Sequence, residues 1–240
     1  MHHFEYVSKS KITPIKKELI QLICCVQNEV RNQFTFQYEF VGSVKRNMVT
    51  CDMGSNIGFD FDINILVNDD DEEYCAKDIK NILMRAFNKF AYKYRYDSCE
   101  DSTRVFTIKV KDTKHSRVLH SCDFAVVKSC DDFRKKYIRL NKKSNIYTWE
   151  KQSSHYYSLP PKIEFCKDHS LWGIVRDTYI RKKNLNSDKN KKSRSIFAET
   201  INQVCQQNGY SDKPSKPEAR TYKDDLIPSI SCKAVCLSLY

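Results

Sequence analysis

Three aspartates have the spacing that chemistry with a metal ion would need. Asp60 and Asp62 alternate with apolar residues in the run 59–67, and Asp123 is the only acid in a second apolar run, 117–127. Because side chains alternate across a β-strand, both acids of the first run would share one face, opposite Phe59, Phe61, Ile63, Ile65 and Val67. Mg²⁺ prefers hard oxygen ligands, so carboxylates from neighbouring strands could converge on it. The simpler alternative is a solvent-exposed face of an antiparallel sheet.

A Gly-Ser pair precedes the acids. Gly42 and Ser43 follow the strand-like run 34–41. A small residue lets backbone N–H groups approach a phosphate, and the serine adds a hydroxyl. Lys45 and Arg46 come next and could also meet a triphosphate. The pair alone carries little weight, so the interpretation depends on its combination with the acids in this order.

In that order, the motifs resemble the signature of the DNA polymerase β-like nucleotidyltransferase superfamily. The pattern is hydrophobic-Gly-(Gly/Ser), then hydrophobic-Asp-x-Asp-hydrophobic, then an aspartate on a later strand. The layout is most similar to the branch with oligoadenylate synthetases, cyclic GMP-AMP synthase and its bacterial relatives, and nucleotidyltransferase toxins. The resemblance covers roughly residues 13–130. One departure is the stretch from Ser43 to Asp60, which is longer than in many members.

The resemblance implies an enzyme that moves a nucleoside monophosphate from a nucleoside triphosphate to a hydroxyl, with release of pyrophosphate. It also implies a divalent cofactor, Mg²⁺ or alternatively Mn²⁺. The nucleotide-binding residues would be Gly42, Ser43, Lys45 and Arg46. The catalytic and metal-binding residues would be Asp60, Asp62 and Asp123.

The acceptor stays open at this point. An RNA 3′ end, another nucleotide and a protein side chain are all compatible with the motifs. The formal net charge of +11 favours RNA or a nucleotide over an acidic protein surface. A second-messenger synthase needs a substantial helical lobe to close over two nucleotides. The short part of the chain after Asp123 therefore favours a simple transferase of toxin or defence type, and a synthase of a cyclic or linear product is the alternative. A catalytically inactive nucleic-acid-binding module also fits. A basic stretch could contact RNA, although a solvated loop is the simpler interpretation: Lys189, Lys191, Lys192 and Arg194.

Periodicity predicts an α+β fold, with a mixed sheet flanked by helices. Helical spacing of apolar residues predicts helices over 13–30, 79–94, 168–182 and 195–209. Alternation predicts strands over 34–41, 59–67, 104–110, 117–127 and 145–149. Thr13 and either Ser193 or Ser195 are expected as helix N-caps, and Gly209 as a C-terminal cap.

These elements predict three parts of the chain. A nucleotidyltransferase core would cover 1–130, a smaller, mainly helical part 131–210, and a flexible tail 211–240. The 11 cysteines are scattered and include no Cys-x-x-Cys pair, which favours buried thiols in a reducing compartment. No secretory signal or apolar window of ~18 residues is visible, so we expect a cytoplasmic protein with no membrane partner. Two aromatic residues could stack on a nucleotide base, or could have an ordinary role in the core or at the surface: Tyr147 and Trp149.

Overall fold

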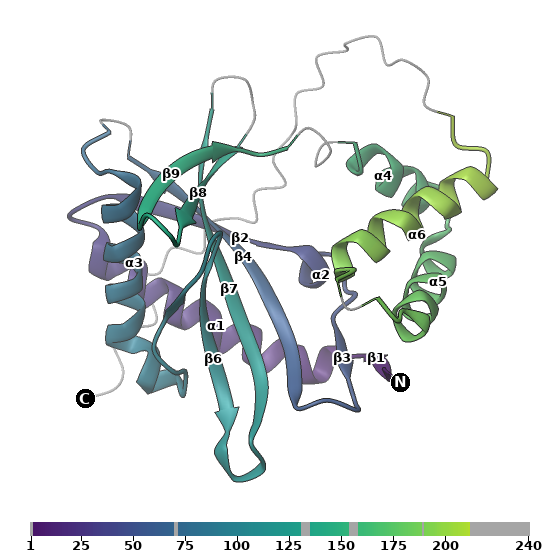
Figure 1. Cartoon of the computed structure of the whole chain (residues 1–240), viewed down its shortest axis with the longest axis horizontal. Coiled ribbons are helices and arrows are strands. Elements are labelled where there is room, and N and C mark those ends of the chain that lie inside the picture. The colour runs from purple at the N-terminus through teal and green to yellow at the C-terminus, as the bar shows by residue number, and fades with distance from the viewer. Residues whose placement is uncertain (1, 70–71, 131–134, 154–157, 189, 212–240) are drawn as a thin grey trace.

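A seven-stranded mixed sheet forms the centre of the molecule (Figure 1). The computed structural model describes residues 2–69, 72–130, 135–153, 158–188 and 190–211. Strands β4 and β7 run parallel, and the other paired strands of this sheet run antiparallel. The strands are β2 (Thr35–Val41), β4 (Ile57–Asn68), β5 (Glu100–Asp101), β6 (Phe106–Asp112), β7 (Arg117–Ser129), β8 (Lys135–Asn141) and β9 (Ile146–Lys151). The predicted α+β class with a mixed sheet is confirmed.

Two long helices, α1 (Lys9–Val30) and α3 (Ala76–Ala91), cover the apolar face of this sheet. The period-two pattern of β4 explains why they pack there. Phe61, Ile63 and Ile65 are at most 1% exposed and pack with the apolar stripes of both helices. The opposite face of β4 is thereby left to the polar residues.

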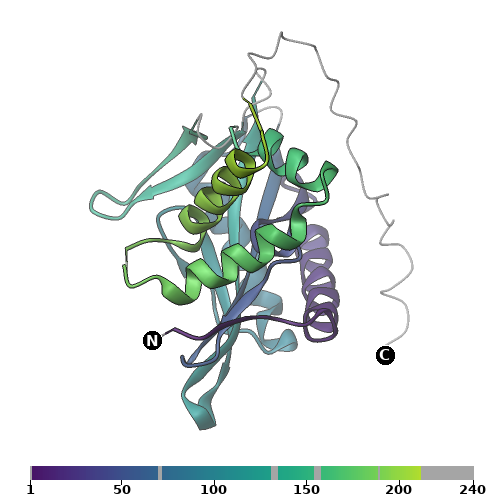
Figure 2. The same cartoon turned by 90° about the vertical axis from the view of Figure 1, so that its right-hand side faces the viewer.

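A second group of helices has its own core. It consists of α4 (Pro160–Asp168), α5 (Trp172–Leu185) and α6 (Ser193–Gln207), which lie apart from α3 in Figure 1 and face the viewer in Figure 2. Val175, Tyr179 and Ile201 are buried together there, and Met48 joins them from the long connection that precedes β4. The connection therefore links the helical group to the sheet.

That connection also contains secondary structure. It forms a short helix, α2 (Gly42–Lys45), and β3 (Thr50–Asp52). Strand β3 pairs antiparallel with β1 (Phe4–Tyr6), which precedes α1, in a separate two-stranded sheet. The extra length between Ser43 and Asp60 is thus used to meet a segment from the beginning of the sequence.

Several predicted boundaries were wrong. Helix α1 begins at Lys9, because the Ser8 hydroxyl accepts a hydrogen bond from Lys11 N–H (3.3 Å), and Pro14 lies inside the helix. The Thr13 hydroxyl is no N-cap and donates to the Lys9 carbonyl (2.8 Å). The helix predicted over 168–182 starts later, at Trp172, after α4 has ended.

The last helix corrects one cap and confirms another. The N-cap of α6 is Lys192 and makes no side-chain hydrogen bond, so neither predicted serine caps the helix. Gly209 follows the C-cap Asn208 with φ of 77°, as a C-terminal glycine should. Almost all of the tail predicted over 211–240 lies outside the described residues. Within the described part of the chain, no helix has the length and apolar character to cross a membrane.

Candidate active site

The three aspartates meet where two parallel strands run side by side. Asp62 of β4 and Asp123 of β7 are direct register partners, and Asp60 is the register partner of Ser121. Neighbouring strands lie about 4.8 Å apart, so the two runs of sequence bring these side chains to one patch of the sheet. The patch lies on the face that α1 and α3 do not cover.

Strand β2 brings the Gly-Ser pair to the same patch. Its last residue, Val41, pairs with Asp62, so Gly42 comes directly beside that carboxylate. A Cβ on Gly42 would lie 2.2 Å from Asp62 Oδ2, and the glycine has φ of 62°. A residue with a side chain is excluded both by the contact and by the left-handed backbone. Of the predicted site residues, Gly42, Ser43 and the three acids are therefore brought together.

Crowding of like charges governs the electrostatics of the patch. Burial, followed by repulsion from Asp123 and Asp60, raises the pKa of Asp62 to about 6. Burial is also the largest cause of the raised pKa of Asp123, which a hydrogen bond from Thr107 partly offsets. Clustered carboxylates of this kind bind protons or cations readily.

Two hydroxyl groups fix the directions of the carboxylates. The Thr107 hydroxyl on β6 donates to Asp123 Oδ1 (2.6 Å), and the Ser121 hydroxyl donates to Asp60 Oδ1. Asp123 and Asp60 thus each have one oxygen held by a hydroxyl of the sheet. Across the described ranges, no three His, Cys, Asp or Glu side chains are gathered so as to hold a metal ion as they stand.

The two basic residues predicted for the site have different surroundings. Lys45 is exposed and forms an ion pair with Glu39 on β2 (2.7 Å). The Arg46 guanidinium carbon lies 4.1 Å from the centroid of the Phe197 ring on α6. Arg46 also lowers the pKa of Asp62, against the larger effect of burial. Arg46 thus lies between the acids and the helical group, and Lys45 lies further out.

Sequence reasoning missed Lys183, which belongs to this region. Lys183 is on α5, is 6% exposed, and donates from Nζ to Thr50 Oγ1 (2.7 Å). Burial lowers the pKa of Lys183 to about 8, and attraction by Asp60 is the largest opposing effect. A signal was present, because Lys183 continues the buried stripe of Val175 and Tyr179 at helical spacing of four. A lysine on such a stripe needs a polar partner.

The aromatic residues considered for base stacking pack elsewhere. Tyr147 and Trp149 on β9 contact the core cluster shared with α3, and the Tyr147 hydroxyl donates to Asp101 Oδ2 (2.6 Å). Asp101 also pairs with the fully buried Lys80 (2.6 Å). These contacts hold the β8–β9 hairpin against α3.

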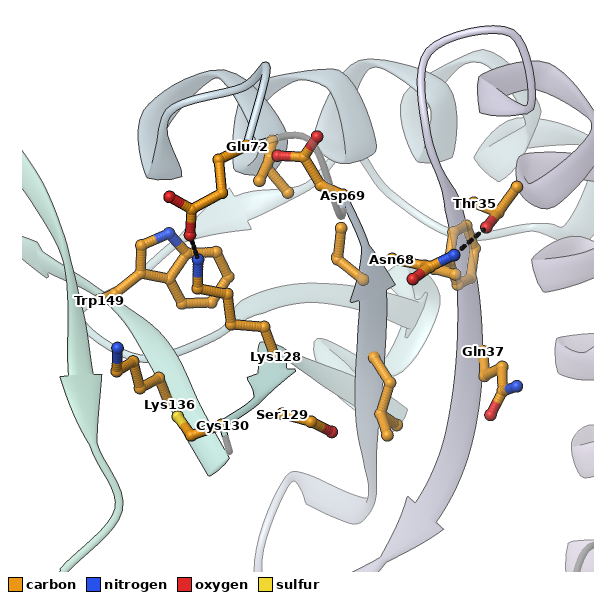
Figure 3. Close-up of a pocket in the computed structure, with 14 residues that line it drawn as sticks. Thr35, Gln37, Asn68, Asp69, Glu72, Lys128, Ser129, Cys130, Lys136 and Trp149 are labelled. Carbon is orange, nitrogen blue, oxygen red and sulfur yellow. Dashed lines mark hydrogen bonds and ion pairs between the residues drawn. The ribbon is translucent and has the colours of Figure 1, made fainter. Parts of the chain in front are cut away.

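A cavity of about 770 Å³ lies away from the acids, between the end of β4 and the β8–β9 hairpin (Figure 3). Trp149, Lys128 and Asn68 line it, and an ion pair from Lys128 to Glu72 (2.7 Å) lies along one side. The predicted site residues do not line it. The acid patch, with its crowded charges, remains the better candidate for chemistry.

The basic stretch near α6 is only partly described. Lys189 lies outside the described residues. Lys191 forms an ion pair with Glu199 (2.7 Å), and Lys192 is the N-cap of α6. The proximity of this stretch to RNA therefore stays a prediction.

Comparison with solved structures bears on the fold. No protein-family model and no curated protein sequence matches the chain. The crystal structure of Vibrio cholerae DncV cyclic AMP-GMP synthase, a prokaryotic cGAS homolog, is similar with a TM-score of 0.54 and 12% identity, over 88% of this chain and 55% of that one. The same enzyme with the linear intermediate 5′ pppA(3′,5′)pG gives 0.54 and 11%, over 87% and 56%.

The DncV form bound to 3′-deoxy ATP is similar to the same degree, with a TM-score of 0.52 and 13% identity over 87% of this chain and 55% of that one. The present chain spans just over half the length of these structures. At this identity the likeness establishes the fold alone. The chain has the nucleotidyltransferase fold of the cyclic GMP-AMP synthase-like enzymes, and the resemblance predicted from the motifs is confirmed at that level.

Proposed function

We propose that the chain is a nucleotidyltransferase that moves a nucleoside monophosphate from a nucleoside triphosphate to a hydroxyl group. The observation that carries the proposal is the close approach of Gly42 to Asp62, with Asp123 in register beside it. The Gly42-Ser43 turn, which would bind the phosphates, therefore lies beside the carboxylates. The α-phosphorus would be attacked by the acceptor oxygen, and the bond to the pyrophosphate would break.

The carboxylate patch suits a divalent cation chemically. Its donors are hard oxygens, and Asp62 is held near other acids that repel its negative charge. The residues that would hold Mg²⁺ or Mn²⁺ are Asp60, Asp62 and Asp123. Asp60 and Asp123 would use the carboxylate oxygen that does not accept a hydrogen bond from Ser121 or Thr107. The ion would neutralise charge on the triphosphate and on the attacking oxygen.

The remaining residues would bind and orient the triphosphate. Ser43 would supply its hydroxyl, and the residues after Gly42 would supply their backbone N–H groups. Arg46 would supply a positive charge near Asp62. Lys183 approaches from α5 on the side of Asp60. Positive groups from both the sheet side and the helical side would thus surround the phosphates.

For the acceptor we propose a second nucleotide. The helical group contacts the segment after Ser43 through Phe197 and Arg46, and Arg46 also attracts the Asp62 carboxylate, so the helices would bound one side of the patch. DncV, whose fold is similar, is described with a linear dinucleotide intermediate, which supports a nucleotide hydroxyl as acceptor. An RNA 3′ end is the alternative, favoured by the net charge of +11.

The test is incubation of the purified chain with each α-³²P-labelled nucleoside triphosphate and Mg²⁺ or Mn²⁺, alone, in pairs, and with total RNA. We expect metal-dependent transfer of label into a dinucleotide or longer oligonucleotide, with pyrophosphate release. If the label appeared in RNA only, RNA would be the acceptor instead of a second nucleotide. No transfer and no metal-dependent triphosphate binding would leave the inactive nucleic-acid-binding module.

A further inference from the structure

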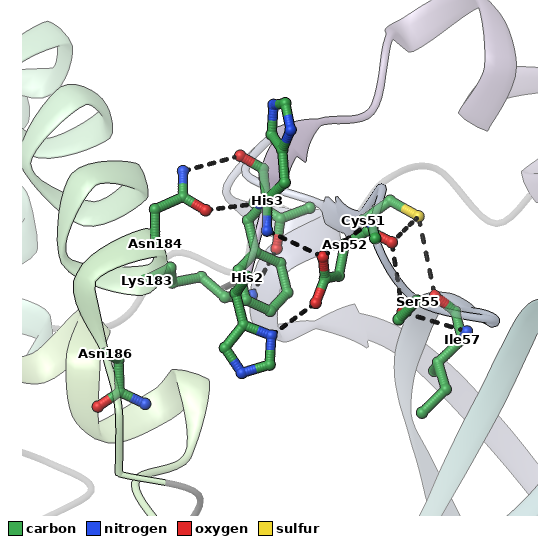
Figure 4. Close-up of polar contacts among 12 residues, drawn as sticks. His2, His3, Cys51, Asp52, Ser55, Ile57, Lys183, Asn184 and Asn186 are labelled. Atoms are coloured by element: carbon green, nitrogen blue, oxygen red, sulfur yellow. Dashed lines mark hydrogen bonds and ion pairs between the residues drawn. The ribbon is translucent and has the colours of Figure 1, made fainter.

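The segment that contains β1 is fastened to α5 by its backbone (Figure 4). Asn184 accepts a hydrogen bond from Phe4 N–H at Oδ1 (2.6 Å) and donates from Nδ2 to the Phe4 carbonyl (3.1 Å). One side-chain amide therefore satisfies both backbone groups of a single residue of the strand. Next along, the Tyr6 hydroxyl donates to the Arg176 carbonyl (2.7 Å).

This docking puts an aromatic ring against the buried lysine of the site. Lys183 Nζ lies 3.8 Å from the centroid of the Phe4 ring. The same ammonium donates to Thr50 on β3, the strand that pairs with β1. An ammonium has three donors, so one hydroxyl and one ring leave it able to bind a phosphate oxygen.

The other edge of the segment is anchored as well. The buried Asp52 of β3 accepts hydrogen bonds from His3 N–H (3.0 Å) and from Gly54 N–H (3.1 Å), and its other oxygen contacts His2 Nδ1 (2.7 Å), as Figure 4 shows. Burial alone would raise the pKa of Asp52, and these hydrogen bonds lower it instead. The segment is thus held between β3 and α5.

We propose that Phe4 and Asn184 are positioning residues of the nucleotide site, and that they hold the Lys183 ammonium on the side of the acids. The proposal rests on the proposed function for its substrate, a nucleoside triphosphate. Phe4 itself would not touch the nucleotide. It would hold a flexible four-carbon side chain in place, with its ammonium against the ring and the Thr50 hydroxyl, where the charge of Asp60 attracts it.

The test uses substitutions in the full chain. Phe4→Leu removes the ring and keeps the apolar volume, and Asn184→Ala removes both hydrogen bonds to the strand. Each should raise KM for the triphosphate about 10-fold and change kcat less than about twofold, because contacts to non-reacting phosphates act alike in the ground and transition states. Phe4→Tyr keeps a ring and should restore the wild-type KM.

Glu5→Gln is the matched control on the same strand, since Glu5 is exposed and its side chain pairs with His3 alone among the ion pairs of the described residues. It should leave KM unchanged. A double mutant then separates positioning from general damage. If Phe4 acts through Lys183, Phe4→Leu combined with Lys183→Met should raise KM no further than Lys183→Met does. Additive effects, or a Phe4→Leu variant with wild-type KM, would overturn the proposal.

A second measurement needs no turnover. Acylation of lysines by an amine-reactive ester, read by mass spectrometry, should be slow at the buried Lys183 of the wild type and several-fold faster in Phe4→Leu. Exposed lysines should react equally in both. An inactive wild type would refute the proposed function, and the labelling would still decide the positioning claim. Equal labelling of Lys183 in both proteins would refute that claim.

Discussion

Two polar clusters in this molecule differ in how their charges are balanced. Beneath α3, the Lys80 ammonium pairs with Asp101 (2.6 Å) and also donates to the Ser102 carbonyl (3.0 Å). At the other cluster, the acids of β4 and β7 repel one another, and Lys183 donates to a hydroxyl instead of a carboxylate. The first cluster is complete within the protein. Under the proposed function, the second would gain from an external cation and an external anion, which a nucleotide with its metal would provide.

Asp62→Asn should give the largest effect on this contrast. Transfer should fall by at least about 1,000-fold, because stabilisation of the transition state by the metal is worth several kcal/mol. Stability of the metal-free protein should rise instead. The folded-state pKa of Asp62 is raised to about 6, whereas an unfolded aspartate titrates at about 3.9, so stability falls as the pH rises between these values. The full cost, up to about 3 kcal/mol, is therefore present at pH 7.

The rate of transfer from a labelled triphosphate would test the first expectation. Denaturant unfolding in EDTA at pH 7 would test the expected gain in stability. Asn64→Asp provides no suitable control, since it adds charge to the same face. Asp97→Asn does, because that carboxylate is half exposed and pairs with Lys111 at the surface. An Asp62→Asn protein that is both active and destabilised would mean that the acid patch, like the Lys80–Asp101 cluster, is a structural cluster complete within the protein.

Lys80→Met should have the next largest effect, and only on stability. It leaves Asp101 without its buried counter-ion, which costs about 3–5 kcal/mol of unfolding free energy. The matched control on the same helix is Lys89→Met, whose ion pair with Glu29 is exposed and worth at most about 1 kcal/mol. Urea unfolding of the three proteins measures the difference. Equal losses in both variants would contradict a completed structural cluster.

Lys183 should make stability depend on pH in the alkaline range. Its folded pKa is lowered to about 8, whereas an unfolded lysine titrates near 10.4. The unfolded chain therefore binds more protons between these values, and stability should rise as the pH goes from 7 to 10, by up to about 3 kcal/mol. Lys183→Met should lack this rise, and the exposed Arg181→Met should keep it. Parallel pH profiles for all three would place the ammonium in water.

Ser43→Ala should give the smallest effect. We expect KM for the triphosphate to rise about fivefold, near 1 kcal/mol, because backbone N–H groups share the phosphate contact. Ser144→Ala, in the exposed β8–β9 turn, is the control. Steady-state kinetics at saturating Mg²⁺ would suffice. An unchanged KM and kcat would remove the Ser43 hydroxyl from the site while leaving the acids in place.

The acid patch could be predicted because its information is local. Alternation along 59–67 assigns Asp60 and Asp62 to one face, and the observed strand has that alternation. The placement of Asp123 beside them follows from the parallel pairing of β4 with β7, whereas the sequence predicted only that a neighbouring strand would supply this acid. The roles of these residues, and of Gly42, Ser43, Lys45 and Arg46, stay predictions until activity is measured.

What was missed depends on distant contacts. Strand β1 has three residues and no repeat of its own, and it exists because β3 pairs with it. Strand β8 alternates poorly, since Tyr137 and Ile138 are both buried by neighbours on opposite faces. Lys183 lay just beyond the predicted helical span, and its burial requires Phe4, some 180 residues earlier. The periodicity of a short stretch of sequence cannot predict partners that lie so far away along the chain.

The bond between Phe4 and Asn184 joins residues 180 positions apart, and this separation has a kinetic consequence. Closing so long a loop slows folding, because the intervening chain loses conformational entropy before the contact can stabilise it. The sheet with α1 and α3 can form from residues 9–129, and β1 can pair with β3 at that stage, whereas the bonds from Phe4 to Asn184 must wait until α5 has been synthesised and has folded. During synthesis on the ribosome, a folded sheet should therefore precede the proposed nucleotide site, and the acids would be assembled before Lys183 reaches its buried position.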